Sequence, residues 1–117
     1  MVTFEVYLNK RTICLAGVGT NGVLTSILNY VCGRGRRELR MEIGGLVSPT
    51  DEHLRWSVVR PKVGDEIRIR IRKTDKPDEP RKRYRDDPAK VLEAKKNCVR
   101  RYAKELGWTI FEHTKHS

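Results

Sequence analysis

The sequence predicts an α+β fold: a mainly antiparallel β-sheet, as a meander or a small sandwich, with one C-terminal amphipathic helix. Three observations carry this prediction. Short segments that alternate apolar and polar residues recur through residues 1–72, and this period is typical of half-buried strands. Turn residues separate these segments. One apolar stripe at helical spacing follows over 88–107. Because a chain of 117 residues fits one core, we expect 1–117 to be a single domain.

The first sixteen residues predict a β-hairpin. Residues 3–8 alternate, with Phe4, Val6 and Leu8 on one side of the strand. Residues 9–11 supply a short polar turn, and 12–16 return at strand spacing through Ile13 and Leu15. The two segments are therefore expected to pair antiparallel.

A glycine-rich stretch, LAGVGTNGVL, comes next. Gly17, Gly19 and Gly22 have the G-x-G-x-x-G spacing of a dinucleotide-binding turn. Such a turn needs a parallel βαβ unit, whereas the strand before Gly17 already has a hairpin neighbour. We therefore interpret the stretch as a turn that needs positive φ. The following segment, 22–32, fits either a helix, by its apolar spacing, or a strand, by its β-branched residues and the Asn21-Gly22 turn pair.

Three further strands are predicted at 38–43, 53–58 and 66–73. We expect Gly44-Gly45 to break or bend the first of them, and 61–65 to form the turn before the last. The side chains expected to face the core are Leu39, Met41 and Ile43, then Leu54, Trp56 and Val58, then Ile67, Ile69 and Ile71. Arg68, Arg70 and Arg72 are expected to face outward.

The C-terminal third combines a charged segment with a helix. Residues 74–87 contain prolines and many charges without periodicity, which predicts an exposed linker. Asp87 as N-cap, a proline after it and Gly107 as the stop predict a helix over 88–107, whose stripe we expect to pack on the sheet. Residues 108–111 are expected to add a short strand or to cover the edge of the core, and 112–117 to form a loose tail.

Three motifs in this chain carry a resemblance to known proteins: GGLVSPTDEHLRW, then VGDEIRIRI, then a helix that ends in ELGW. Together they resemble a group of small bacterial proteins to which no activity is assigned. The resemblance covers most of the chain and implies one compact domain. It implies no catalytic residue and no cofactor.

Cysteine usage and the chain's polarity predict a cytoplasmic protein. Cys14, Cys32 and Cys98 form no C-x-x-C pair, and we interpret them as small reduced hydrophobic residues. No run of 18 apolar residues is present, and the first residues lack the layout of a signal peptide. We expect no cofactor and no metal, with His113 and His116 in a solvated tail. The one cluster with acid-base potential is Asp51, Glu52, His53, Asp65 and Glu66.

The net charge of +10 indicates an acidic partner. We predict a non-enzymatic binding or adaptor protein that presents a basic surface to an acidic protein. The alternatives are a nucleic-acid-binding protein and a small enzyme with a site near His53. No membrane partner is expected, and a homo-oligomer is compatible with the sequence. We expect Arg40 and Arg55 on the same outer sheet face as the arginines of 66–73. The predicted binding residues are Arg68, Arg70, Arg72, Arg81, Lys82, Arg83, Tyr84, Arg85, Lys96, Arg100 and Lys104.

Overall fold

The computed structural model describes residues 1–111 and confirms the α+β class. The chain divides into two compact units, Met1–Arg85 and Asp86–Ser117. Of the elements in the described part of the chain, the first unit contains the seven strands and the second contains the α-helix. The predicted single domain stays a prediction, and the predicted loose tail at 112–117 lies outside the described residues.

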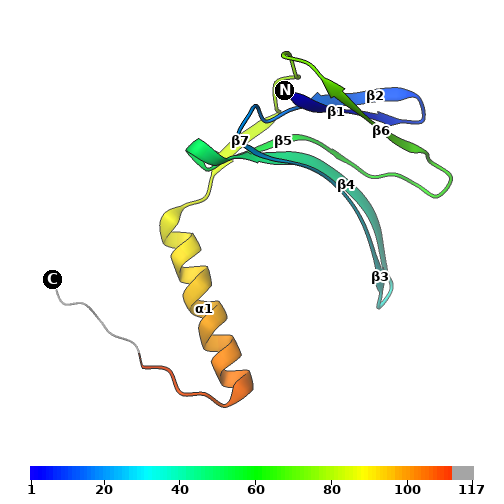
Figure 1. The fold of residues 1–117 in the computed structure, drawn as a ribbon. Coiled ribbons are helices and arrows are strands. Elements are labelled where there is room, and N and C mark those ends of the chain that lie inside the picture. Colours follow the sequence, from blue (N-terminus) through cyan, green and yellow to red (C-terminus); the bar gives the residue numbers. More distant parts are fainter. Residues whose placement is uncertain (112–117) are drawn as a thin grey trace. The chain divides into compact units, whose positions relative to one another are not determined.

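Two antiparallel sheets form the first unit and face each other (Figure 1). Sheet A has the order β2-β1-β6. Its strands are β1 (Val2–Leu8), β2 (Arg11–Ala16) and β6 (Ile67–Lys73). The predicted hairpin is confirmed, since Asn9 and Lys10 both have positive φ in the two-residue turn between β1 and β2. This arrangement places the first strand in the centre of its sheet.

Sheet B has the order β3-β4-β5-β7. The segment left open between helix and strand is β3 (Gly22–Gly33), which pairs along its whole length with β4 (Arg36–Val47). Positive φ at Arg34 and Gly35 makes the tight turn between them. The short 3-10 helix Ser48–Thr50 leads into β5 (Glu52–Val59), and β7 (Lys82–Arg85) completes the sheet. β4 continues through Gly44-Gly45, so the expected break is wrong. The alternative of a bend agrees with the register shift at Ile43/Gly44 and with Figure 1, which shows β3 and β4 curving away from sheet A.

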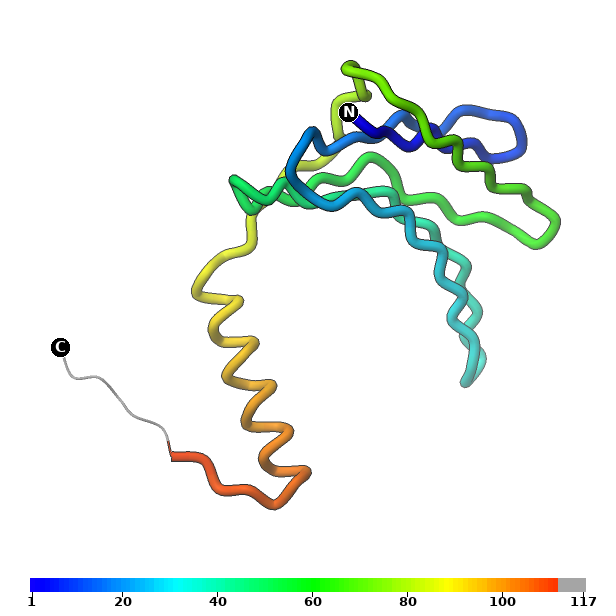
Figure 2. Tube along the Cα trace, in the orientation of Figure 1, coloured from blue at the N-terminus to red at the C-terminus, as the bar shows by residue number. Residues whose placement is uncertain are grey.

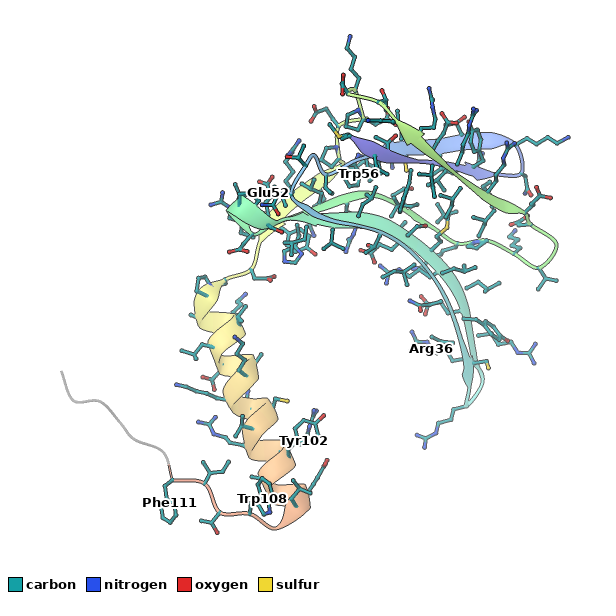
Figure 3. All side chains as sticks on the ribbon, viewed as in Figure 1. Arg36, Glu52, Trp56, Tyr102, Trp108 and Phe111 are labelled. Atoms are coloured by element: carbon teal, nitrogen blue, oxygen red, sulfur yellow. The ribbon has the colours of Figure 1, made fainter. Side chains whose placement is uncertain are left out.

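The hydrophobic core lies between the two sheets. Sheet A contributes Val6, Cys14 and Ala16, and sheet B contributes Met41, Ile43, Leu54 and Trp56. The buried residues of β2 are thus Cys14 and Ala16, while Ile13 and Leu15 are half-buried. Figure 3 shows Trp56 between the two layers, where its indole N–H donates to the carbonyl oxygen of Asp78 at 2.7 Å.

A β-bulge in β5 changes which side chains face the core. The neighbouring residues Ile43 and Gly44 of β4 pair with Ser57 and Arg55 of β5. Trp56, between these two partners, is therefore an extra residue with no partner in β4. Leu54 and Trp56 are buried as predicted, but Val58 is displaced to the other face and is 38% exposed. The prediction that Val58 shares the core face with Trp56 is wrong because a bulge shifts the alternation by one residue.

β6 has the predicted alternation but less burial than predicted. Ile67 packs against the core, whereas Ile69 is 40% and Ile71 is 72% exposed. The isoleucines share a face with Phe4, Val6 and Leu8 by register, but β6 lies at the edge of sheet A. An edge strand covers only one flank of a core, so the outer isoleucines remain accessible to solvent.

The predicted linker over 74–87 is wrong in part, because 82–85 form β7 and Asp78 is bonded to both sheets. The backbone N–H of Asp78 donates to Leu15 O, and its carboxylate accepts from Leu15 N at 2.9 Å. Its carbonyl oxygen accepts the indole N–H of Trp56 in sheet B. Figure 2 shows the segment after β6 beside the amino terminus, where Thr74 and Met1 are hydrogen-bonded.

The predicted helix is confirmed as α1 (Pro88–Leu106). The Asp87 side chain caps it by accepting from Ala89 N, and Gly107 at positive φ ends it. Residues 108–111 form no strand, so the first of the two alternatives for this segment is wrong. Tyr102, Trp108 and Phe111, labelled in Figure 3, are 52%, 71% and 87% exposed.

The Asp65 carboxylate, in the turn between β5 and β6, is expected to make the stability of the fold depend on pH. The Asp65 carboxylate accepts the Lys62 N–H at 2.7 Å and the Asn9 side-chain amide at 2.8 Å, and both bonds hold its pKa below the ordinary value of 3.8. Because this pKa is lowered on folding, the stabilisation is present above the unfolded pKa and is lost as the pH falls through the folded pKa.

We therefore expect Asp65→Asn to lower the thermal midpoint at pH 7, and the difference from wild type to shrink in acid. Thermal unfolding of both proteins at pH 7 and at about pH 2 measures this. The control is Asp51→Asn, in the turn after the 3-10 helix, where among the described residues no donor bonds the carboxylate. An Asp65 effect that is equal at both pH values would contradict the prediction.

Candidate interface on the outer face of sheet B

A mainly apolar hollow of the first unit lies on the face of sheet B that points away from sheet A. Register defines this face: Met41 and Ile43 point into the core, so Glu42, Gly44 and Leu46 point outward. The hollow has a volume of about 390 Å³. It is lined by Val23, Thr25, Ile27, Glu42, Gly44, Gly45, Leu46, His53, Leu54 and Tyr84. We call it the sheet B hollow.

An aromatic pair with a cation above it forms one wall of the hollow. His53 of β5 and Tyr84 of β7 are cross-strand partners, and their rings stack with centroids 4.9 Å apart and planes 11° apart. The Lys82 ammonium lies 5.1 Å from the Tyr84 ring centroid. Tyr84 is 37% exposed, so the pair presents a planar aromatic surface beside a positive charge.

Ion pairs neutralise the carboxylates on this face. Glu42 binds Arg55 at 2.8 Å and Arg40 at 3.2 Å. Glu38 binds Arg36 at 2.6 Å and Arg60 at 3.0 Å, and these guanidinium groups lower its pKa. Each of the two carboxylates is shared by two arginines, so the outer face of sheet B retains a positive balance.

Gly44 at the floor of the hollow keeps it open. A Cβ at Gly44 would lie 2.8 Å from the Leu54 carbonyl oxygen. Gly44 pairs with Arg55 at the bulge, where the two strands come close together. A side chain at this position is excluded, and Val23, Ile27 and Leu46 therefore line a concave apolar surface.

The arginines of β6 lie on a different surface from those of β4 and β5. Arg68, Arg70 and Arg72 occupy the outer face of sheet A, opposite Tyr7, Glu5 and Thr3. The expectation that Arg40 and Arg55 share a face with them is wrong, because the strands belong to two sheets that face each other. Arg68, Arg70 and Lys10 line a small hollow of about 220 Å³ with Tyr7 and Glu66.

The polar face of β1 is buried, which the sequence did not predict. Thr3 is fully buried, and Glu5 is 9% exposed. The Tyr7 hydroxyl donates to the Glu5 carboxylate, which also binds Arg72 at 2.6 Å. Both contacts lower the pKa of Glu5, and the hydrogen bond from Tyr7 has the larger effect. Arg72 is consequently held by the fold, while Arg68 lies 5.7 Å from the Tyr7 ring centroid.

The predicted basic segment 81–85 splits over two faces of β7. Lys82 and Tyr84 share the outer face with Arg55 and His53, their partners in register. Arg83 lies on the other face and binds Glu79 at 2.9 Å and Glu52 at 3.2 Å, and these contacts raise its pKa. Arg81 N donates to Arg55 O, and Arg85 pairs with Glu52 in the ladder. Only Lys82 and Tyr84 of the predicted set adjoin the sheet B hollow.

The three predicted helix residues lie in the second unit. Lys96, Arg100 and Lys104 are exposed along α1, and Arg100 contacts Asn97 at 3.1 Å and Glu93 at 3.6 Å. Lys104 lies in the last turn, where a cation stabilises the helix by offsetting its dipole. A structural role thus accounts for two of the three residues.

The predicted acid-base cluster is not assembled. Asp51 and Glu52 lie at the start of β5, whereas Asp65 and Glu66 lie beyond its other end and bond to Asn9. His53 stacks on Tyr84 instead. The dinucleotide hypothesis, which the sequence disfavoured, fails because β3 follows Gly22 and no helix begins there. His113 and His116 lie outside the described residues.

The apolar lining of the sheet B hollow was missed by the sequence analysis. Val23, Ile27 and Leu46 come from two strands, and only the register of β3 with β4 brings them to one face. The signal available was the run of β-branched residues in 22–32, but its secondary structure was open. A strand assignment there would have placed Val23 and Ile27 on one face.

Comparison of the chain with family models, with curated proteins and with solved structures finds no match. Within residues 1–111, no helix has the length and apolar character needed to cross a membrane. The cysteines are free thiols, and burial raises the pKa of Cys14 to about 11. Cys14 is accordingly a protonated core residue at neutral pH.

Proposed function

We propose that the protein is a non-enzymatic binding protein that holds an acidic protein partner on the outer face of sheet B. The observation that carries this proposal is the apolar sheet B hollow beside Lys82 and Tyr84. An apolar or aromatic side chain of the partner would fill the hollow, and carboxylates next to it would contact Lys82. Buried anchors of this kind contribute most of the affinity of protein interfaces.

Electrostatics favour an acidic partner over a neutral one. The chain carries +10, and Lys82 has no ion pair with any described carboxylate. Arg40 and Arg55 share Glu42, so one negative charge offsets two positive ones at the floor of the hollow. Complementary charge increases association rates and selects against basic competitors.

The first test is a titration followed by amide chemical shifts. The probes are short peptides with one tryptophan or leucine between glutamates, and matched peptides with lysines in place of the glutamates. We expect the acidic peptides to shift the amides of Val23, Ile27, Leu46, His53 and Tyr84. Binding should weaken as salt rises from about 50 to about 200 mM.

Lys82→Glu is expected to weaken the acidic peptide about tenfold, because a rim charge at the hollow is reversed. The matched control is Arg68→Glu, which reverses one charge on the outer face of sheet A. That control should leave the peptide affinity within about twofold of wild type, because a charge on the outer face of sheet A acts on the peptide only through a smaller, screened long-range effect. Equal losses in both variants, or shifts confined to Tyr7, Lys10 and Arg70, would overturn the assignment to sheet B.

A second candidate function is binding of single-stranded nucleic acid, which the His53–Tyr84 stack favours. A planar aromatic pair beside Lys82 suits a stacked base with a neighbouring phosphate. Fluorescence anisotropy with labelled single-stranded DNA, duplex DNA and RNA tests this at about 50 and about 200 mM salt. A preference for single strands that Tyr84→Ala abolishes would support it. Equal and weak binding to all three would exclude it.

The proposed role includes a cytoplasmic location and no catalysis. Three free cysteines support a reducing compartment. General acid-base catalysis needs its titratable groups within reach of one substrate. Asp51 and His53 lie at the start of β5, whereas Asp65 and Glu66 lie beyond its other end, and this separation supports a binding function over acid-base chemistry.

A further inference from the structure

The free edge of β3 differs from every other sheet edge of the first unit. β3 is a 12-residue edge strand that, within residues 1–111, pairs with no strand but β4. Its sequence, GVLTSILNYVCG, contains no charged residue, although 34% of the chain is charged. Proteins normally protect long edge strands with charges, prolines or a covering segment.

The other three edges carry such protection. β6 presents Arg68, Arg70, Arg72 and Lys73, and β7 is the short basic strand KRYR. β2 is covered at Leu15, whose N–H and carbonyl oxygen both bond to Asp78. The β3 edge lacks a comparable device, so its unpaired backbone groups are open to another strand.

Both faces of β3 also expose apolar side chains near this edge. On the outer face, Ile27 is 49% and Val31 is 47% exposed. On the opposite face, Leu28 is 55% and Tyr30 is 58% exposed. These four residues surround Asn29, and large apolar exposure of this kind marks an interaction surface.

We propose that β3 pairs antiparallel with β3 of a second copy of this chain, around a two-fold axis at Asn29. This register places Ile27 of one copy opposite Val31 of the other on the outer face. It places Leu28 opposite Tyr30 on the other face. Apolar cross-strand pairs of this type stabilise sheets, and a two-fold contact uses the same patch on both subunits. The two four-stranded sheets then form one continuous sheet.

Charge favours a second copy over an acidic partner at this edge. Every copy carries +10, so self-association requires a contact strand without cations, and β3 meets this condition. Pairing of two copies through β6 or β7 would place the cations of one copy against those of the other. An acidic chain would find no cation on β3. The pairing uses the edge of sheet B, and although its Ile27 also lines the sheet B hollow, the lining residues Leu46, His53 and Tyr84 lie on other strands and stay available for the proposed partner.

Sedimentation velocity over a range of protein concentrations tests the proposal. We expect a dimer of twice the 13.6 kDa chain, and its dissociation constant should fall as salt rises from about 50 to about 500 mM, because salt screens the repulsion between two cationic copies. This sign is opposite to that expected for the acidic peptides. The two proposals can therefore fail separately.

A matched pair of substitutions locates the contact. Val31→Lys should weaken the dimer at least about tenfold, because it places a charge on the uncharged strand. Val63→Lys makes the same change at a 97% exposed position in the turn between β5 and β6, and should leave the dimer unchanged. Circular dichroism confirms that both variants fold.

Hydrogen exchange of the wild-type protein provides a readout that needs no variant. Amides of β3 should exchange more slowly at high protein concentration, while amides of β6 and β7 should not change. A monomer at all concentrations and salts, equal effects of the two valine substitutions, or protection confined to another strand would each overturn the proposal.

Discussion

Trp56→Ala is expected to destabilise the first unit by about 3–5 kcal/mol, the range for truncating a large buried aromatic side chain. Trp56 is 3% exposed and lies in the core between the sheets. Its indole also donates to Asp78, so the substitution removes a contact to the segment that joins both sheets. Because small domains are stable by about 5–15 kcal/mol, the substitution should remove a large fraction of the total stability. Urea denaturation followed by circular dichroism measures the loss.

Trp56→Phe separates the two contributions of this residue. Phenylalanine retains most of the apolar volume but has no N–H group, so the Asp78 carbonyl oxygen loses its donor. The expected cost is about 1–3 kcal/mol for the hydrogen bond and the small loss of volume. If Trp56→Ala and Trp56→Phe destabilise equally, the hydrogen bond would dominate. If neither reduces the free energy of unfolding by about 1 kcal/mol, the placement of Trp56 in the core is wrong.

Gly45→Ala is expected to destabilise the same unit by about 1–3 kcal/mol through overpacking. The added Cβ would lie 2.4 Å from Val18 Cγ1 and 2.6 Å from the Val23 carbonyl oxygen. The second contact involves the backbone of the neighbouring strand, which is fixed by the continuous pairing of β3 with β4. The strands must therefore separate locally. The free energy of unfolding in urea, compared with wild type, gives the effect.

A double substitution tests the cause of this strain. Val18→Ala removes the side-chain contact but keeps the contact to Val23 O, so Val18→Ala with Gly45→Ala should be more stable than the sum of the two single effects predicts. A coupling of about 0.5–3 kcal/mol is the range for residues in contact. Strict additivity would show that the predicted overlap with Val18 is absent.

The sequence predicts the strands whose alternation is continuous and misses what depends on pairing. The β1–β2 hairpin and α1 follow from local turn and capping residues, such as Asp87 and Gly107. Val58 is misassigned because a bulge at Trp56 has no local signature. The β7 strand is missed since its four residues form a strand only through their partners in β5.

The candidate site is predicted even less completely, for the same physical reason. Lys82 and Tyr84 are among the predicted binding residues, and both adjoin the hollow. Their separation from Arg83 and Arg85 follows from strand alternation once 82–85 are a strand. The division of the arginines between two sheets required the topology, because β4 and β6 have the same pattern in sequence.

The central position of β1 has a consequence for how the chain folds during synthesis. Val2 pairs with Lys73, and the amino group of Met1 bonds to Thr74 O. β1 is synthesised before β6 and therefore waits for one of its two neighbours until residues 67–73 have been made, and pairing between segments so far apart in sequence is typical of slow folding. Throughout that interval the β3–β4 hairpin can already form from neighbouring residues, with its uncharged edge exposed to other nascent chains.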